Sequence, residues 1–222
     1  MRSDRTEFRI QKSELRIIAL VLLMLCGCGG PETEKRTAVA PKKILLPDVY
    51  RVKLETTKGD IVIEVKNEWA PRAADRFYEL VQAGYYNDSR FHRVMRGFIA
   101  QFGIAGDPRQ GALYRDLKFP DEPVVLGNKR GTVAFAHSGP NTRAVQVFLN
   151  LKDNSTLDKQ GFPAFGKIVE GMEVADKLSF LYGELAPKGA GPDGIQAELR
   201  GNAYLDRDFP RLDSLRKASV LP

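Results

Sequence analysis

The segment Phe91–Gln101, Phe-His-Arg-Val-Met-Arg-Gly-Phe-Ile-Ala-Gln, combines a cation, a neutral amide and large apolar side chains. A strand over its first residues would place Phe91, Arg93 and Met95 on one face, so Arg93 would have apolar neighbours. A buried cation is unfavourable unless it has a partner or a task. Arg93 is therefore either an ion-paired structural residue or a permanently charged hydrogen-bond donor at a functional site.

Two elements precede this segment and would position it. Apolar residues alternate along 49–56 and again along 61–65, with a turn at Lys58-Gly59 between them, which predicts a β-hairpin. Pro71 then opens a stretch in which apolar residues recur at helical spacing, and Gly84 follows as a stop signal. The pattern predicts a helix between Pro71 and Gly84.

The following part of the chain reads mainly as short strands. Residues 101–123 are rich in glycine and proline and are predicted as a loop, and residues 131–150 read as strand, turn and strand. A further strand is expected over 164–169, and Gly171 is expected to open a short helix that ends near Phe180. Many short strands with one early and one late helix indicate a mainly β fold, a closed antiparallel barrel capped by helices.

The N-terminal residues have the pattern of an export signal. A net basic lead precedes the apolar run Ile17–Leu25, which is shorter than the roughly 20 residues that a membrane span needs. Leu25-Cys26-Gly27-Cys28 resembles a bacterial lipobox in which Cys28 receives the lipid; Cys26 fits less well, because bulky Leu25 would precede it. We expect an exported lipoprotein, anchored on the periplasmic or outer side of a bacterial envelope. An ordinary cleaved signal and an uncleaved anchor are the alternatives.

The chain is expected to divide into a signal peptide (1–27), a flexible tether (28–47), a barrel domain (48–182) and a polar C-terminal extension (183–222). Its 43% hydrophobic and 28% charged residues are typical of a globular protein. The net charge of +6 is interspersed, which argues against nucleic acid as a partner. Two cysteines near the N-terminus and two histidines in total argue against a disulfide framework, a thiol nucleophile or a histidine-rich metal site in the domain.

Five motifs, taken in chain order, resemble the cyclophilin family of peptidyl-prolyl cis–trans isomerases. They are Phe91-His92-Arg93-Val94 with Gly97-Phe98 and Gln101; Gly106-Asp107-Pro108; Phe119-Pro120-Asp121-Glu122; Gly139-Pro140-Asn141-Thr142 with Gln146 and Phe148; and Phe165-Gly166-Lys167-Ile168 with Glu170-Gly171-Met172. The resemblance covers roughly residues 49–180. It implies a cyclophilin-like closed eight-stranded antiparallel β-barrel capped by two α-helices.

The resemblance also implies roles for individual residues. Arg93 matches the catalytic arginine, and Gln146 matches a glutamine near the site. The remaining candidates are the walls of a pocket for the proline ring and the groups that hold the peptide beside it: Phe98, Ile99, Phe148, Leu157 and Phe162 for the walls, and Gln101, Ala136 and His137 for the peptide.

The implied reaction explains why these residue types suffice. An Xaa–Pro bond must rotate through a twisted state against a barrier of about 18–20 kcal/mol. No bond is made or broken, so the reaction needs neither a nucleophile nor a metal nor another cofactor. An apolar pocket would grip the ring, polar groups would fix the flanking peptide, and Arg93 would donate to the prolyl nitrogen of the twisted state.

Several positions depart from the family pattern. The family usually has Met at Ile99, Asn at His137, Phe at Val147, Trp near Leu157 and His near Phe162, and the segment 101–107 is longer than usual. These differences imply that any binding of a cyclosporin-type ligand is weakened. They also motivate a rival hypothesis, a module that binds or scaffolds proline-containing segments with little turnover.

Two further expectations concern histidines and assembly. A hydrolase built on His92 or on His137-Ser138 lacks a convincing set of serine, histidine and acid. His92 is instead expected as a hydrogen-bonded structural residue behind the strand. We expect a monomer whose partners are proline-containing polypeptides and, through its lipid, a membrane.

Overall fold

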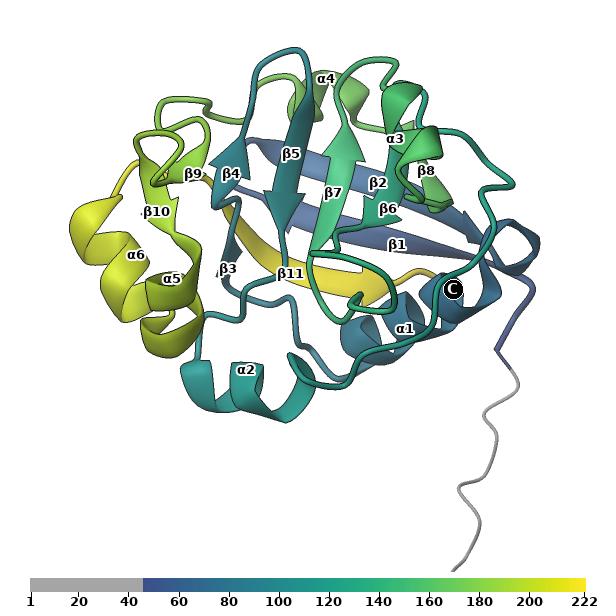
Figure 1. Ribbon diagram of the computed structural model, residues 1–222, viewed down its shortest axis with the longest axis horizontal. Coiled ribbons are helices and arrows are strands. Elements are labelled where there is room, and N and C mark those ends of the chain that lie inside the picture. The colour runs from purple at the N-terminus through teal and green to yellow at the C-terminus, as the bar shows by residue number, and fades with distance from the viewer. Residues whose placement is uncertain (1–45) are drawn as a thin grey trace, which may run out of the picture. The chain divides into compact units, whose positions relative to one another are not determined.

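One antiparallel sheet of nine strands organises residues 46–222, the part of the chain that this computed structural model describes. The strand order is β3-β11-β1-β2-β8-β6-β7-β5-β4 (Figure 1). The strands are β1 (Val49–Thr56), β2 (Gly59–Lys66), β3 (Ser89–Arg90), β4 (Arg93–Val94), β5 (Ile99–Phe102), β6 (Thr132–Phe135), β7 (Val147–Asn150), β8 (Ala164–Glu170) and β11 (Ser214–Val220). A separate parallel pair joins β9 (Leu185–Ala186) to β10 (Gly191–Asp193).

Six α-helices and one 3-10 turn accompany the strands in the described residues. They are η1 (Asn67–Trp69), α1 (Pro71–Gln82), α2 (Pro108–Tyr114), α3 (Thr156–Lys159), α4 (Met172–Ala175), α5 (Gly194–Arg200) and α6 (Asn202–Asp208). In Figure 1, α1 and α2 lie along one side of the sheet and α3 and α4 along the other, while α5 and α6 lie beside β9 and β10. None of the described helices is long and apolar enough to cross a membrane.

The predicted hairpin and first helix are confirmed. β1 and β2 pair from Val49↔Lys66 to Thr56↔Gly59, and Gly59 makes the turn with φ +127°, a conformation that few other residues adopt. Pro71 occupies the start of α1, where its missing N–H is no loss, and Phe77 is among the residues that the helix buries.

The sheet curls so that its two outer strands follow one another in the chain. β3 and β4 stand at opposite ends of the strand order, yet only Phe91 and His92 separate them. The mainly β fold is confirmed. The main sheet has nine strands rather than the expected eight, the described α-helices number six rather than two, and no pairing joins β3 to β4 in this part of the chain. The edge strands β3 and β4 stay near each other because Phe91 and His92 connect them, and not because hydrogen bonds pair them.

The last strand lies inside the sheet. β11 pairs with β1 on one side and with β3 on the other, and Leu215 within it is completely buried. Residues 183–222 were expected as a polar extension with at most a last turn or two of helix. They instead form β9, β10, α5, α6 and β11, and the sheet includes their final strand.

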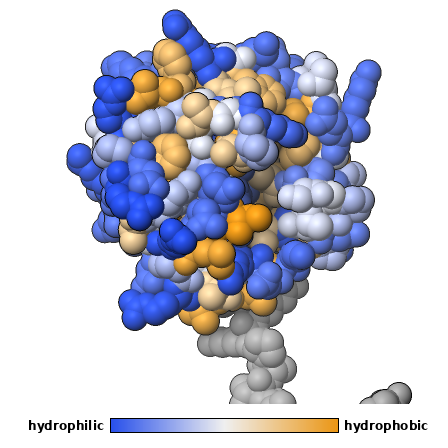
Figure 2. All heavy atoms as spheres, turned by 60° about the vertical axis from the view of Figure 1, so that its left-hand side comes forward, coloured by the Kyte–Doolittle hydropathy of each residue, from blue (hydrophilic) through white to orange (hydrophobic). Residues whose placement is uncertain are grey.

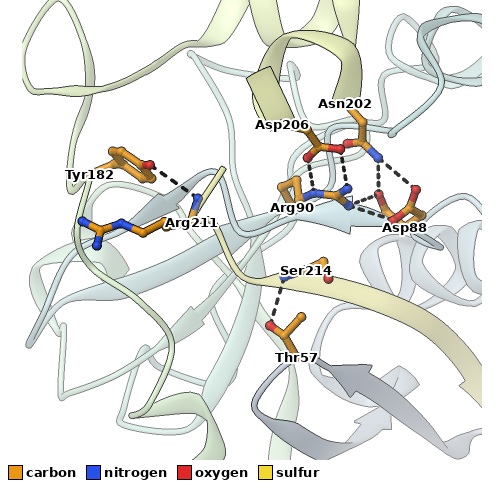
Figure 3. Close-up of polar contacts among 8 residues, drawn as sticks. All are labelled: Thr57, Asp88, Arg90, Tyr182, Asn202, Asp206, Arg211 and Ser214. Carbon is orange, nitrogen blue, oxygen red and sulfur yellow. Dashed lines mark hydrogen bonds and ion pairs between the residues drawn. The ribbon is translucent and has the colours of Figure 1, made fainter. Parts of the chain in front are cut away.

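Charged contacts attach α6 to the edge strand β3 (Figure 3). Arg90 donates from Nε and Nη2 to the two carboxylate oxygens of Asp206, both at 2.9 Å. Its Nη1 donates to Asp88, and Asn202 donates to the same aspartate. α6 is therefore held against the edge of the sheet by a bidentate ion pair and its neighbours.

The loop expected over residues 101–123 contains a helix. α2 begins at Pro108, and the carboxylate of Asp107 accepts a hydrogen bond from the backbone N–H of Arg109 at 2.9 Å. An aspartate followed by a proline is a helix start signal, and it was present in the sequence. The expected signal peptide, Cys28 and nearly all of the tether lie outside the described residues.

Candidate active site

A row of side chains crosses three neighbouring strands at one level. Arg93 on β4 is paired in register with Gln101 on β5, and Gln101 is paired with Phe148 on β7. Residues paired across antiparallel strands point to the same face. The strand register alone therefore brings the arginine, the amide and one aromatic ring together.

The opposite face of the same strands forms the core. Phe102 and Val147 are completely buried in the main hydrophobic cluster, whereas Ile99 and Phe148 belong to a separate cluster with Leu157. The period of two along a strand assigns alternate residues to the two faces. Val147, one of the positions that departs from the family pattern, consequently packs in the core and not in the candidate site.

An apolar cavity of about 240 Å³ lies against this row. It is lined by Arg93, Phe98, Ile99, Gln101, Ala136, His137, Phe148, Leu157, Gln160 and Phe162. The structure thus brings together every predicted site residue in the described chain except Gln146. It adds Gln160, an exposed residue of the polar turn around α3.

Gln146 lies next to the cavity rather than in it. Arg93 Nη1 donates to Gln101 Oε1 at 3.1 Å, and Gln101 Nε2 donates to Gln146 Oε1 at 2.8 Å. Gln146 also lines a second cavity, of about 430 Å³, which shares Gln101, Ala136 and His137 with the first. An extended chain that passes from one cavity to the other would lie along this polar row.

Arg93 also has an ionic partner that sequence reasoning missed. Its Nε and Nη2 donate to the two carboxylate oxygens of Glu184 at 2.5 and 2.6 Å. The pair is largely shielded from solvent, with side-chain exposures of 19% for Arg93 and 27% for Glu184. Hydrogen bonding to Arg93 lowers the pKa of Glu184, against the opposing effect of burial. Arg93 is therefore ion-paired, as one reading expected, and it also lines the cavity, where its functional role stays a prediction.

A stack of two rings forms one wall of the cavity. The His137 and Phe162 rings are 4.1 Å apart with planes 27° from parallel, and Phe162 meets Phe148 edge to face at 5.7 Å. Burial, assisted by the nearby charge of Arg143, lowers the pKa of His137. His137 is thus favoured in its neutral form at the cavity.

Buried asparagines fix the segment that carries Leu157 and Phe162. Asn128 Nδ2 donates to the Phe162 carbonyl at 2.7 Å and to Asp158 at 2.8 Å. Asn150 Nδ2 donates to Asn128 Oδ1 at 3.0 Å, from the end of β7. Hydrogen bonds that satisfy buried amides have a specific geometry. This series of hydrogen bonds therefore fixes the position of the cavity wall that Leu157 and Phe162 form.

His92 lies behind Arg93 and is completely buried. The expected hydrogen bonding is met only loosely: neither ring nitrogen makes a hydrogen bond of good geometry within the described chain, but the Arg90 backbone and the Gln146 side chain lie close enough to favour the protonated ring. Burial lowers the pKa of His92 to about 4, which keeps the imidazole neutral near pH 7. A neutral histidine packed behind the strand contributes packing and not charge to the site.

The described residues contain no group of three or more histidine, cysteine or acidic side chains that could hold a metal ion. The surface in Figure 2 is mainly hydrophilic, with hydrophobic side chains in small groups. The arrangement that remains can grip a small apolar ring, align a peptide along two amides and present guanidinium N–H groups beside it. Fold and site together are those of a curled β sheet with a cavity suited to a small apolar ring on a peptide.

Comparisons with known proteins identify the family. The family model "Cyclophilin type peptidyl-prolyl cis-trans isomerase/CLD" matches residues 51–189. The rat protein named peptidyl-prolyl cis-trans isomerase-like 3 is 38% identical over 133 residues, which are 59% of this chain and 82% of that protein. Peptidyl-prolyl cis-trans isomerase A of Dickeya dadantii is 38% identical over 134 residues, 58% of this chain and 70% of that protein. The chain belongs to the cyclophilin-type peptidyl-prolyl cis–trans isomerases, and it is an enzyme of that class.

Solved structures agree on the fold. The Cryptosporidium parvum cyclophilin-type isomerase superposes with a TM-score of 0.57 at 23% identity, covering 78% of this chain and 98% of that one. The cyclophilin AquaCyp293 of Hirschia baltica gives 0.54 at 21% identity, covering 78% of this chain and 74% of that one. The share of this chain that aligns exceeds the share matched by the sequence relatives, as expected if the fold persists where the sequence diverges.

Proposed function

We propose that this isomerase acts on Xaa–Pro bonds of exported or envelope proteins, and that Arg93 is its catalytic group. The observation that carries the proposal is that Arg93 shares one cavity with Phe98, Phe148 and Leu157. An apolar pocket and a cation at its edge are the two things that the reaction needs. The C. parvum isomerase has also been crystallised in the presence of the dipeptide Ala-Pro, which supports a peptide ligand for this chain's pocket.

Catalysis follows from stabilising the twisted amide. Uncatalysed rotation takes roughly 10–100 s, because amide resonance is lost on the way. The proline ring enters the cavity between Phe98, Phe148 and Phe162, and the backbone at Ala136 and His137, with Gln101, holds the flanking peptide. Arg93 then donates a hydrogen bond to the prolyl nitrogen, whose lone pair is free only in the twisted state. The hydrogen bond is stronger there than in the planar ground state, which is the condition for catalysis.

The donor capacity of Arg93 is sufficient for this role. A guanidinium has five N–H groups, and the contacts to Glu184 and Gln101 use three of them. Two N–H groups therefore remain for a substrate, one on Nη1 and one on Nη2.

The cellular setting of the proposal rests on the N-terminal sequence. Ile17–Leu25 and the lipobox-like Leu25-Cys26-Gly27-Cys28 support export and lipid attachment at Cys28. The residues between Cys28 and β1 would act as the tether, and the domain would work as a monomer held near a membrane. Acyl chains contribute roughly 0.8 kcal/mol of membrane affinity for each buried CH₂ group.

Turnover of a cis-prolyl peptide by the purified protein tests the catalytic assignment. Arg93→Ala is expected to lower kcat/KM about 10- to 100-fold, the equivalent of about 1.5–3 kcal/mol for a hydrogen bond to a charged group. The matched control is Arg96→Ala, because Arg96 lies in the same hairpin but contacts Phe180 and not the cavity. Normal turnover by Arg93→Ala would contradict the proposed catalytic role of Arg93.

The same assay distinguishes catalysis from the rival hypothesis, a module that binds or scaffolds proline-containing segments with little turnover. Ile99, His137 and Leu157, which differ from the family pattern, all line the cavity. A module that binds without turnover would shift peptide resonances in NMR titrations while leaving the cis–trans exchange rate unchanged. We propose that a cyclosporin-type ligand binds weakly, since the family's tryptophan is replaced at this wall.

A further inference from the structure

The segment between α4 and α6 brings two carboxylates to the two ends of the polar row. Glu184 binds Arg93 in the bidentate pair described above. Glu198 on α5 accepts a hydrogen bond from Gln146 Nε2 at 3.0 Å. The continuous series is Glu184, Arg93, Gln101, Gln146 and Glu198, with an acidic residue at each end.

From Arg93 to Glu198 the hydrogen bonds in this row run in one direction. Arg93 donates to Gln101, Gln101 donates to Gln146, and Gln146 donates to Glu198. An ionised carboxylate only accepts, so Glu198 requires the NH₂ group of Gln146 to face it. The amide oxygen of Gln146 then faces Gln101 and sets that amide in turn, leaving its oxygen toward Arg93.

Glu184 is itself held before any substrate arrives. Its Oε1 accepts from the backbone N–H of Leu185 at 2.8 Å, and its carbonyl accepts from Gly191 at 2.8 Å. A side chain at Gly191 would place a Cβ 2.6 Å from that carbonyl oxygen, so the two segments pack with no space between them. The backbone that carries the Glu184 carboxylate is therefore held in a tightly packed turn.

The helix that carries Glu198 is also fixed. Ala197, the preceding residue, is completely buried in a small cluster with Ile104 and Leu205. Asp193 caps α5 by accepting a hydrogen bond from the backbone N–H of Gln196 at 2.8 Å. Glu184 and Glu198 therefore both lie on parts of the segment whose backbone is held in place.

Neither carboxylate blocks the apolar cavity. Arg93 lines that cavity and Glu184 does not, while Glu198 lines the neighbouring cavity and not this one. Glu184 holds the Nε and Nη2 edge of the guanidinium, so it acts from outside the cavity. We propose that Glu184 and Glu198 are positioning residues that orient Arg93, Gln101 and Gln146 for the isomerase reaction. This inference rests on the proposed role of Arg93.

Kinetics of charge-removing variants test the inference. Glu184→Gln loses one of two hydrogen bonds to Arg93, and Glu198→Gln lets the Gln146 amide reverse. Each variant is expected to lower kcat about tenfold, the effect of losing a charged hydrogen-bond partner, and to change KM by less than about twofold. Glu184→Asp keeps a carboxylate and should recover part of the loss.

The matched control is Asp206→Asn. It removes a carboxylate from a bidentate arginine pair between the same C-terminal segment and the barrel, but Arg90 does not line either cavity. Its kcat should equal that of the wild type. If Glu184→Gln and Glu198→Gln turn over as fast as the wild type, or faster, the positioning roles are overturned; loss of activity in Asp206→Asn as well would also overturn them.

A second readout keeps the inference separate from the catalytic assignment. The Nε–H of Arg93 should exchange slowly with solvent in the wild type and rapidly in Glu184→Gln, as followed by NMR. If the wild type lacks turnover, the proposed role of Arg93 fails, and this exchange rate still decides whether Glu184 orients the guanidinium. Equal exchange in both proteins would contradict it.

Discussion

His137 and Phe162 stack across the wall of the cavity, with ring centroids 4.1 Å apart. His137 follows β6, whereas Phe162 follows α3, so the wall is assembled from two separate segments. Phe162 also meets Phe148 edge to face, which makes it the link between the stack and the sheet. Phe162 therefore helps to set the shape of the cavity from both sides of this wall.

Phe162→Ala should therefore weaken peptide binding more than it weakens the fold. Loss of two ring contacts, each worth about 0.5–1.5 kcal/mol beyond burial, should raise the KM for a prolyl peptide about 5- to 160-fold. Phe180→Ala is the control, because Phe180 is half exposed and lies outside this cavity. An unchanged KM in Phe162→Ala would show that the stack is not part of the ligand site.

His92 makes stability depend on pH. Its pKa is about 4 in the fold and near 6.5 in an unfolded chain, so between these values the unfolded state binds a proton that the folded state does not. The free energy of unfolding should fall as pH decreases from 6.5 and level off below 4, by on the order of 3 kcal/mol.

Urea unfolding at several pH values measures this dependence. His92→Leu should lose it, and the wild-type minus variant difference cancels contributions from other groups. Parallel curves for the two proteins between pH 7 and pH 4 would disprove the effect.

Gly103 explains how the longer segment after Gln101 fits beside the site. Its φ is +107°, and a Cβ there would lie 2.6 Å from the Val145 carbonyl oxygen and 2.9 Å from the Gln146 Cα. Gly103→Ala should cost about 1–3 kcal/mol through backbone strain alone and should lower kcat/KM by displacing Gln146.

Gly97→Ala is the comparison for Gly103→Ala. Gly97 also has a positive φ, +65°, but a Cβ there would meet nothing within 4 Å. The Gly97→Ala variant should be somewhat less stable than the wild type and should keep its activity. Thermal unfolding and turnover, measured together, distinguish strain from displacement; equal activity in both variants would argue against displacement of Gln146.

The proposed anchor predicts a difference between the two cysteines. Cys28→Ser should abolish lipid attachment and release the protein from the membrane fraction, whereas Cys26→Ser should not, because Cys26 leaves with the signal. Mass spectrometry of the mature N-terminus and fractionation of cells measure the outcome. An unmodified N-terminus in the wild type would contradict the proposal.

Local patterns predicted the elements that local interactions define. The β1–β2 hairpin and α1 followed from alternation, a glycine turn and Pro71. Family motifs identified the residues around Arg93, because the register of β4, β5 and β7 places them together whatever the surrounding sequence.

Long-range partners were not predictable in the same way. Glu184 lies 91 residues from Arg93, in a stretch rich in glycine, proline and charge that carries no helical or strand period. β11 was missed because only Leu215 and Ala218 in it are buried, so its sequence reads as polar. Both features depend on what the rest of the fold presents to them.

The position of β11 determines when the sheet can form during synthesis of the chain. β1 begins at Val49 and its outer neighbour β11 ends at Val220, so the first and last strands of the described chain lie side by side. Until β11 emerges, one edge of β1 has no partner and β3 has none at all. A ribosome or an export channel that still holds residues 214–220 therefore also keeps the sheet incomplete, and the sheet is complete only once this strand is free to pair with β1 and β3.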